Sequence, residues 1–138
     1  MILWRKTKAW VEVFGPRLVG VRINRAAEFA EGIVEEDEYA KLRAEIASQI
    51  LSLKDPDGGA LVREVKTRED VFSGPYAKTA PDLIVFLHPQ YTLRKSVGKA
   101  LRSRDLVTPI TNPVRDGNHE PAGVYIATFG TLRTLVTQ

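Results

Sequence analysis

The stretch Pro81-Asp82-Leu83-Ile84-Val85-Phe86-Leu87 decides the fold that we expect for this chain. Its last five residues are apolar without interruption, and His88-Pro89 ends the run. Continuous apolar runs of this length are typical of a central strand that is covered on both faces of a sheet. We therefore expect the rest of the chain to be arranged around a strand at 82–87. For Asp82 itself, at the start of the strand, the expected role is to cap its own turn.

A β-hairpin is expected near the N-terminus. Trp10 to Phe14 runs in the order aromatic, apolar, acidic, apolar, aromatic, and Gly15-Pro16-Arg17 interrupts it before Leu18 to Ile23 resumes the apolar pattern. Two such runs about a Gly-Pro turn predict paired strands. The following segment, Asn24 to Gly32, has no sustained period and is expected to be a loop.

The clearest helix is expected at 36–53. Its apolar residues recur at spacings of three or four, which places them on one helical stripe: Tyr39, Leu42, Ile46, Ile50 and Leu53. Glu35 to Glu38 lie in its first turn, where carboxylates complement the helix dipole. Asp55 to Gly59 contains a proline and two glycines and is expected to end the helix.

Two further strands complete the expected sheet, one at Ala60 to Val65 and one at Val124 to Ala127, and Thr67 is expected to cap a short helix. The fold class is therefore α/β, with a mixed sheet of about five strands, one main helix at 36–53 and an N-terminal hairpin. Residues 1–138 are expected to form a single domain, because the chain shows no linker, repeat or low-complexity tract.

Composition narrows the function classes. The chain of 138 residues has no cysteine, which excludes disulfides and thiolate metal ligands. No apolar run reaches the roughly 18 residues of a membrane span, and the N-terminus does not resemble a signal peptide. We therefore expect a cytoplasmic protein with no membrane partner.

Charge is distributed unevenly along a chain whose net charge is +3. One basic block is a candidate anion-binding site: Arg94, Lys95, Lys99, Arg102 and Arg104. Closely spaced cations can neutralise phosphate charge, although a solvated loop is the more frequent role of such a run. Only Tyr91 lies nearby to stack on a base, so we do not expect this block to bind nucleic acid.

A second candidate site is the turn Asp116-Gly117-Asn118-His119, which precedes the strand expected at 124–127. A histidine fixed by a glycine turn at the mouth of a strand can hold a metal or carry a proton. It can also be a turn residue bonded to nearby backbone. We take His119, assisted by Asp116, as the candidate ligand of zinc or another divalent metal.

Several short motifs occur in an order that is typical of one enzyme family. They are Trp4-x-x-Thr7-Lys8-Ala9-Trp10, Gly32-Ile33-Val34, Glu38-Tyr39, Leu53-Lys54-Asp55-Pro56-x-Gly58, Ser73-Gly74-Pro75-Tyr76, Ala80-Pro81-Asp82-Leu83 and Gly117-x-His119-x-x-x-Gly123. From Trp4 to Gly130 the chain resembles the C-terminal half of the type I phosphodiesterase/nucleotide pyrophosphatase branch of the alkaline phosphatase superfamily.

The resemblance implies a phosphoryl-transfer fold but only part of its chemistry. Enzymes of this kind use two zinc-type ions, a threonine or serine nucleophile and ligands from several loops. His119 matches the last metal ligand of the family, whereas the other ligands and the nucleophile come from motifs N-terminal to the part that this chain resembles. Leu3 stands where the family usually has an acidic residue, and the tail after Gly130 is shorter than the family's.

Two functions follow as expectations. The first is a truncated, non-catalytic alkaline-phosphatase-like module, without catalytic residues of its own, that forms a homo-oligomer or binds a separately encoded N-terminal half, because a piece of a larger sheet leaves apolar faces and edges uncovered. The alternative is a subunit of a metal-dependent phosphodiesterase or phosphatase, completed by another chain, with His119 as a metal ligand.

Overall fold

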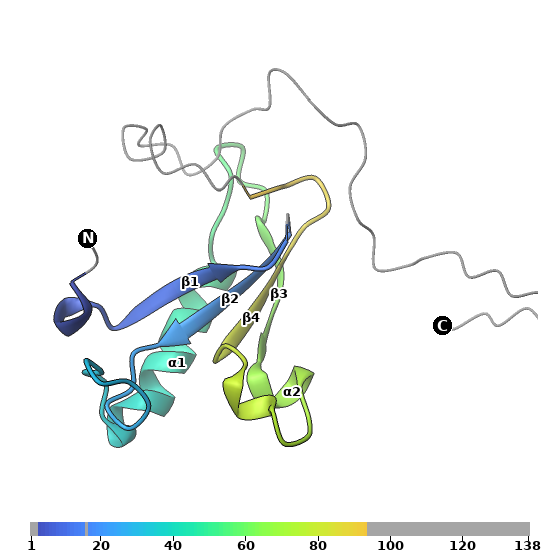
Figure 1. Ribbon diagram of the computed structural model, residues 1–138. Helices are drawn as coiled ribbons and strands as arrows, with labels where there is room; N and C mark the ends of the chain where they lie inside the picture. Colours follow the sequence, from blue (N-terminus) through green and yellow to red (C-terminus); the bar gives the residue numbers. More distant parts are fainter. Residues whose placement is uncertain (1–2, 16, 94–138) are drawn as a thin grey trace, which may run out of the picture.

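The computed structural model describes residues 3–15 and 17–93 of the chain, and these form a sheet with one long helix on one side (Figure 1). In chain order the elements are the 3-10 turn η1 (Trp4–Lys6), the strands β1 (Ala9–Val13) and β2 (Leu18–Ile23), the helix α1 (Glu36–Leu51), the strand β3 (Val62–Thr67), the short helix α2 (Arg68–Val71), the 3-10 turn η2 (Ala77–Thr79) and the strand β4 (Leu83–Leu87).

The four strands lie in the order β1-β2-β4-β3, and every neighbouring pair is antiparallel. This confirms an α/β fold with an N-terminal hairpin. It also confirms the inner position of the apolar run at 83–87, since β4 has a partner on each side. A mixed sheet of about five strands is not confirmed: the described sheet is antiparallel throughout, and the strand expected at 124–127 lies outside the described residues.

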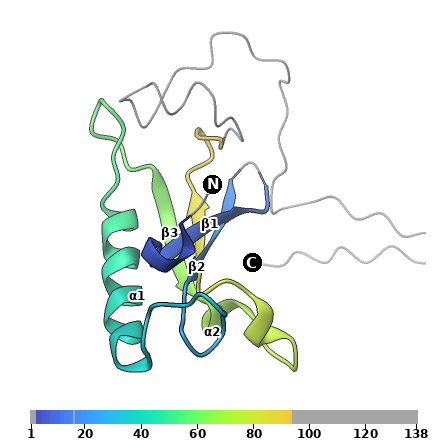
Figure 2. The same cartoon turned by 60° about the vertical axis from the view of Figure 1, so that its left-hand side comes forward.

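The core lies between the sheet and α1, which covers one face of the sheet (Figures 1 and 2). Val19 lies opposite Val85 and Val21 opposite Leu83, so these four side chains point to the same face. The apolar stripe of α1 packs against them through Ile46, Ala47 and Ile50. A second cluster joins Ile23 and Val34 to Tyr39. Burying one side chain of this size stabilises the fold by about 1.5–3 kcal/mol.

The helix ends at Leu51, two residues before the expected end at 53. The Ser52 hydroxyl donates to the Gln49 carbonyl at 2.7 Å and competes with a regular helical turn. The Leu53 carbonyl instead accepts a hydrogen bond from the Leu61 amide at 3.2 Å, which closes the loop around Pro56. Because this loop engages Ala60 and Leu61, β3 starts at Val62 rather than at the expected Ala60.

Asp82 joins three elements and does not act as a cap of its own turn, which corrects the expectation from sequence. Its side chain is fully buried. One carboxylate oxygen accepts from the Ile23 amide at 2.7 Å, and the other accepts from the Tyr39 hydroxyl at 2.8 Å. Arg68 lies 3.5 Å from the same carboxylate and balances its charge. Asp82 therefore links β2, α1 and α2 to the start of β4.

Thr67 caps the start of α2 as predicted. Its backbone amide and its hydroxyl both donate to the carboxylate of Asp70, three residues later, at 3.1 and 2.6 Å. The Thr67 hydroxyl bond lowers the pKa of the Asp70 carboxyl below its usual value. The short helix α2 in turn places Arg68 beside Asp82.

Candidate interaction surface

The residues predicted to carry a metal or an anion all lie outside the described part of the chain. They are Arg94, Lys95, Lys99, Arg102, Arg104, Asp116 and His119. Within residues 3–15 and 17–93, no three His, Asp or Glu side chains come together in a group that could hold a metal ion. The structure thus leaves the metal and anion predictions as they stand.

The resembled family uses a threonine or serine nucleophile, and the hydroxyls of three threonines in the described residues are engaged in local hydrogen bonds. The Thr7 hydroxyl donates to the Leu3 carbonyl at 2.9 Å, and the Thr79 hydroxyl donates to the Tyr76 carbonyl at 2.8 Å. The Thr67 hydroxyl is bound to Asp70 at the start of α2. These bonds are the local turn and cap contacts that are common for threonine.

Among the described strands, β1 forms one edge of the sheet. No described strand pairs with the outer side of β1, whose five residues carry neither lysine nor proline. Val11, the middle residue of the strand, is 60% exposed, and Phe14 just beyond it is 56% exposed. A regular, apolar edge strand offers its unpaired amides and carbonyls to another strand.

The opposite edge, formed by β3, differs in each of these respects. Its pairing with β4 shifts between Val62 and Glu64, as at a β-bulge. It also displays charged side chains at Arg63, Glu64 and Lys66, the last two of which pair at 3.2 Å. Bulges and charges are the usual means by which an edge strand avoids pairing with other chains. The two edges therefore identify β1 as the side that can accept another strand.

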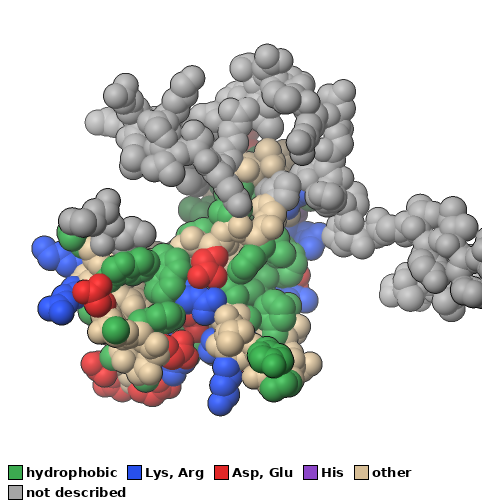
Figure 3. All heavy atoms as spheres, viewed as in Figure 1, with side chains coloured by type: hydrophobic (Ala, Val, Ile, Leu, Met, Phe, Trp, Pro, Cys, Tyr) green, Lys and Arg blue, Asp and Glu red, His purple; other side chains and the backbone are tan. Residues whose placement is uncertain are grey.

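The sheet face turned away from α1 carries apolar side chains beside this edge. Gly20 of β2 lies beneath Pro81 and Phe14, since a Cβ at Gly20 would come within 2.5 Å of the Pro81 ring and 2.6 Å of the Phe14 ring. Figure 3 shows that apolar side chains gather on this face on both sides of an acidic and a basic group. Glycine at position 20 therefore allows both rings to lie against the sheet.

An ion pair between β1 and β2 lies on this same face. Arg22 contacts both carboxylate oxygens of Glu12, at 3.0 and 3.2 Å. The hydrogen bonds from Arg22 hold the pKa of the Glu12 carboxyl below its usual value. Arg22 also donates to the carbonyls of Thr79 and Ala80, at 2.9 and 3.4 Å. It thereby fixes the segment before β4 over the sheet face that is turned away from α1.

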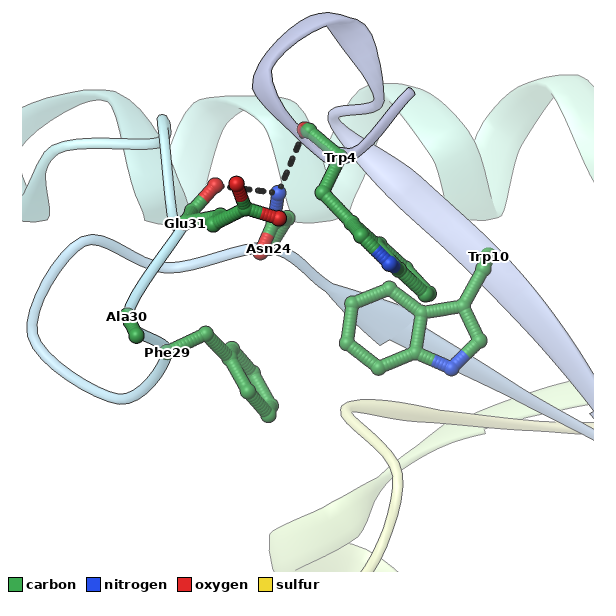
Figure 4. Close-up of a pocket in the computed structure, with 6 residues that line it drawn as sticks. All are labelled: Trp4, Trp10, Asn24, Phe29, Ala30 and Glu31. Carbon is green, nitrogen blue, oxygen red and sulfur yellow. Dashed lines mark hydrogen bonds between the residues drawn. The ribbon is translucent and has the colours of Figure 1, made fainter. Parts of the chain in front are cut away.

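A small pocket lies at the end of this face, between η1, β1 and the loop that follows β2 (Figure 4). It has a volume of about 330 Å³ and is lined by Trp4, Trp10, Asn24, Phe29, Ala30 and Glu31. The rings of Trp4 and Phe29 both meet Trp10 edge-to-face, with centroids 5.2 and 5.1 Å from it and interplanar angles of 78° and 73°. Three aromatic rings thus line one pocket.

Sequence reasoning did not find this pocket, because its rings come from three separate segments. Phe29 lies in a stretch without periodicity, and Trp10 was assigned to a strand and to a family motif but not to a pocket. The segments are brought together by the hydrogen bonds of the Asn24 side chain to the carbonyls of Trp4, Thr7 and Glu31. No local sequence pattern predicts these bonds. The usable signal was composition, since the only two tryptophans of the chain lie six positions apart.

Comparison with protein-family models, with curated proteins and with solved structures gave no match for the chain. Within the described residues, no helix has the length and apolar character needed to cross a membrane.

Proposed function

We propose that this chain is a non-catalytic α/β binding module that associates with a second copy of itself through β1. The observation that carries the proposal is that no described strand pairs with the outer edge of β1, where Val11 is exposed at the middle of the strand. The resemblance to alkaline-phosphatase-like phosphodiesterases agrees with this role, because the part that is resembled belongs to a larger sheet.

Two copies of β1 can pair antiparallel about a two-fold axis, which would join the two sheets into one. Such an interface is isologous, so each copy contributes the same surface and the assembly closes as a dimer. An axis near the middle of β1 would place the two Val11 side chains next to each other, and cross-strand contacts of β-branched residues stabilise paired strands. Phe14, at the end of the strand, would add apolar area to the interface.

The contrast between the two edges supports pairing through β1 rather than β3. Pairing through β3 would have to accommodate a register shift and the charges of Arg63, Glu64 and Lys66. The pairing of β1 with β2 shows no register shift, and the one charged residue of β1, Glu12, is already paired with Arg22. Size-exclusion chromatography with light scattering tests the proposal: a dimer whose mass is twice that of the 15.4 kDa chain is expected at micromolar concentration.

The partner could also be a separately encoded chain that carries the N-terminal half of the resembled fold. It would use the same uncovered surface. A monomer across the micromolar range would argue against self-association and leave this second partner to be sought by co-expression with the neighbouring reading frames.

A further inference from the structure

The shape of the pocket formed by Trp4, Trp10 and Phe29 is fixed by hydrogen bonds from one buried side chain to three backbone carbonyls. The Asn24 side chain, which is 2% exposed, donates from its amide to the carbonyls of Trp4 at 3.0 Å, Thr7 at 2.9 Å and Glu31 at 3.1 Å. It thereby fastens η1 and the 25–34 loop to the end of β2. Because these walls are fixed before any ligand arrives, binding would need little ordering of the protein.

Close packing within the 25–34 loop fixes the wall of the pocket that carries Phe29. A Cβ at Gly32 would lie 2.1 Å from the Arg25 carbonyl oxygen, so only glycine lets the loop close. The amides of Ile33 and Val34 then both donate to the Asn24 carbonyl at 2.9 Å. These contacts position Phe29 across the pocket from Trp4, as Figure 4 shows.

The charges around the pocket favour a cation. Glu31 is the one residue of the lining with a formal charge, and that charge is negative. The Trp10 indole N–H donates to the Glu12 carboxylate at 3.2 Å, which fixes the orientation of the indole ring at the pocket. Arg5 lies 3.5 Å from Glu31, but its side chain is 84% exposed, so this ion pair contributes little and can be displaced.

We propose that this pocket binds a methylated ammonium group. A set of aromatic faces beside a carboxylate recognises such groups, because their charge is spread over methyl groups that are easily removed from water. A volume of about 330 Å³ lies at the lower end of the range of small-molecule pockets and suits a compact group rather than an extended ligand. The group could belong to a small choline-like molecule or to a methylated lysine side chain.

Intrinsic fluorescence measures binding directly, because both tryptophans of the chain line the pocket. We expect choline to change the emission saturably. Its uncharged isostere 3,3-dimethylbutan-1-ol has the same shape and should bind at least about fivefold more weakly, a difference that corresponds to the loss of one cation–π contact. Trimethyllysine, titrated in parallel, distinguishes the two sources of the group, and saturable binding of either compound supports the proposal.

Variants of Glu31 and Phe29, two residues that line the pocket, complete the test. Glu31→Gln and Phe29→Leu should each weaken choline binding by about fivefold, whereas Glu45→Gln, which removes the same charge from the exposed surface of α1, should not change it. Equal binding of choline and its neutral isostere, or no saturable change with either cation, would overturn the proposal. The site does not depend on the proposed self-association, so Val11→Lys should leave choline binding unchanged.

Discussion

The Tyr39 hydroxyl donates a hydrogen bond to the buried carboxylate of Asp82 at 2.8 Å, and this bond joins α1 to the start of β4. The two residues are 43 positions apart in the chain. The same carboxylate holds the Ile23 amide on the next strand, so the helix and two strands meet at one charged group. The stability of this junction is open to direct measurement.

Replacing Asp82 with asparagine should destabilise the protein by about 3 kcal/mol. The amide keeps the shape of the side chain but removes the buried counter-charge of Arg68, which keeps only the exposed Glu69 at 3.6 Å, and breaking a buried ion pair has a cost of this size. Urea unfolding followed by circular dichroism measures the change. Asp57→Asn, in an exposed loop, should remain within about 0.5 kcal/mol of the wild type. Equal effects of the two substitutions would show that Asp82 is not a structural junction.

Stability should fall as pH rises from about 10 to 12. Burial, together with the hydrogen bond to Asp82, raises the pKa of Tyr39 to about 12 in the folded protein. In the unfolded chain the hydroxyl ionises near pH 10, so above that pH the unfolded state releases a proton that the folded state retains. The loss should approach about 2 kcal/mol across this window, and it should be absent below it.

Tyr39→Phe isolates this contribution. The variant should be less stable than the wild type at pH 8, but its stability should decline less steeply between pH 10 and 12. Tyr76→Phe serves as the control, because Tyr76 is 80% exposed. Parallel pH profiles for wild type and Tyr39→Phe would contradict the raised pKa.

Gly20→Ala should destabilise the fold by about 1–3 kcal/mol, which is the usual cost of overpacking. The added methyl group would lie 2.5 Å from the buried Pro81 ring, which cannot rotate away. Gly15→Ala is a matched control, since a Cβ there would meet nothing within 4 Å. Thermal unfolding of both variants compares them. A Gly20→Ala protein as stable as Gly15→Ala would mean that Pro81 does not lie against the sheet.

A metal-dependent phosphodiesterase activity is the alternative function, and a turnover assay on the wild type and on His119→Ala tests it. We expect no turnover of a chromogenic phosphodiester by the isolated chain with added zinc or manganese. A two-metal site needs several ligands and an aligned nucleophile. Turnover that is present in the wild type and lost in His119→Ala would favour the enzyme over the binding module.

The sequence predicted those parts of the fold that depend on local patterns. The hairpin, the apolar stripe of α1, the cap at Thr67 and the inner position of 83–87 each follow from spacing or composition within one segment. The end of α1 was placed two residues too late, because periodicity places Leu53 on the stripe and does not report the side-chain bond of Ser52.

The long-range contacts could not be predicted from local sequence patterns. Asp82 looked like a local cap, yet its partner Ile23 is 59 positions away. The aromatic pocket depends on a buried asparagine that gathers three segments. An unpaired sheet edge was expected in general terms from the resemblance. That β1 lies at an edge of the described sheet, with Val11 exposed at its middle, required the strand order and the exposure of each residue.

The central claim is that two copies associate through β1, and a charge-pairing experiment tests it most directly. Val11→Lys should be monomeric by light scattering, because pairing would bring two ammonium groups together, and Val11→Glu should be monomeric for the same reason. An equimolar mixture of the two should restore the dimer, since the charges then attract. Val71→Lys, the same change on α2, should stay dimeric. A dimeric Val11→Lys protein, or a mixture that remains monomeric, would contradict the account.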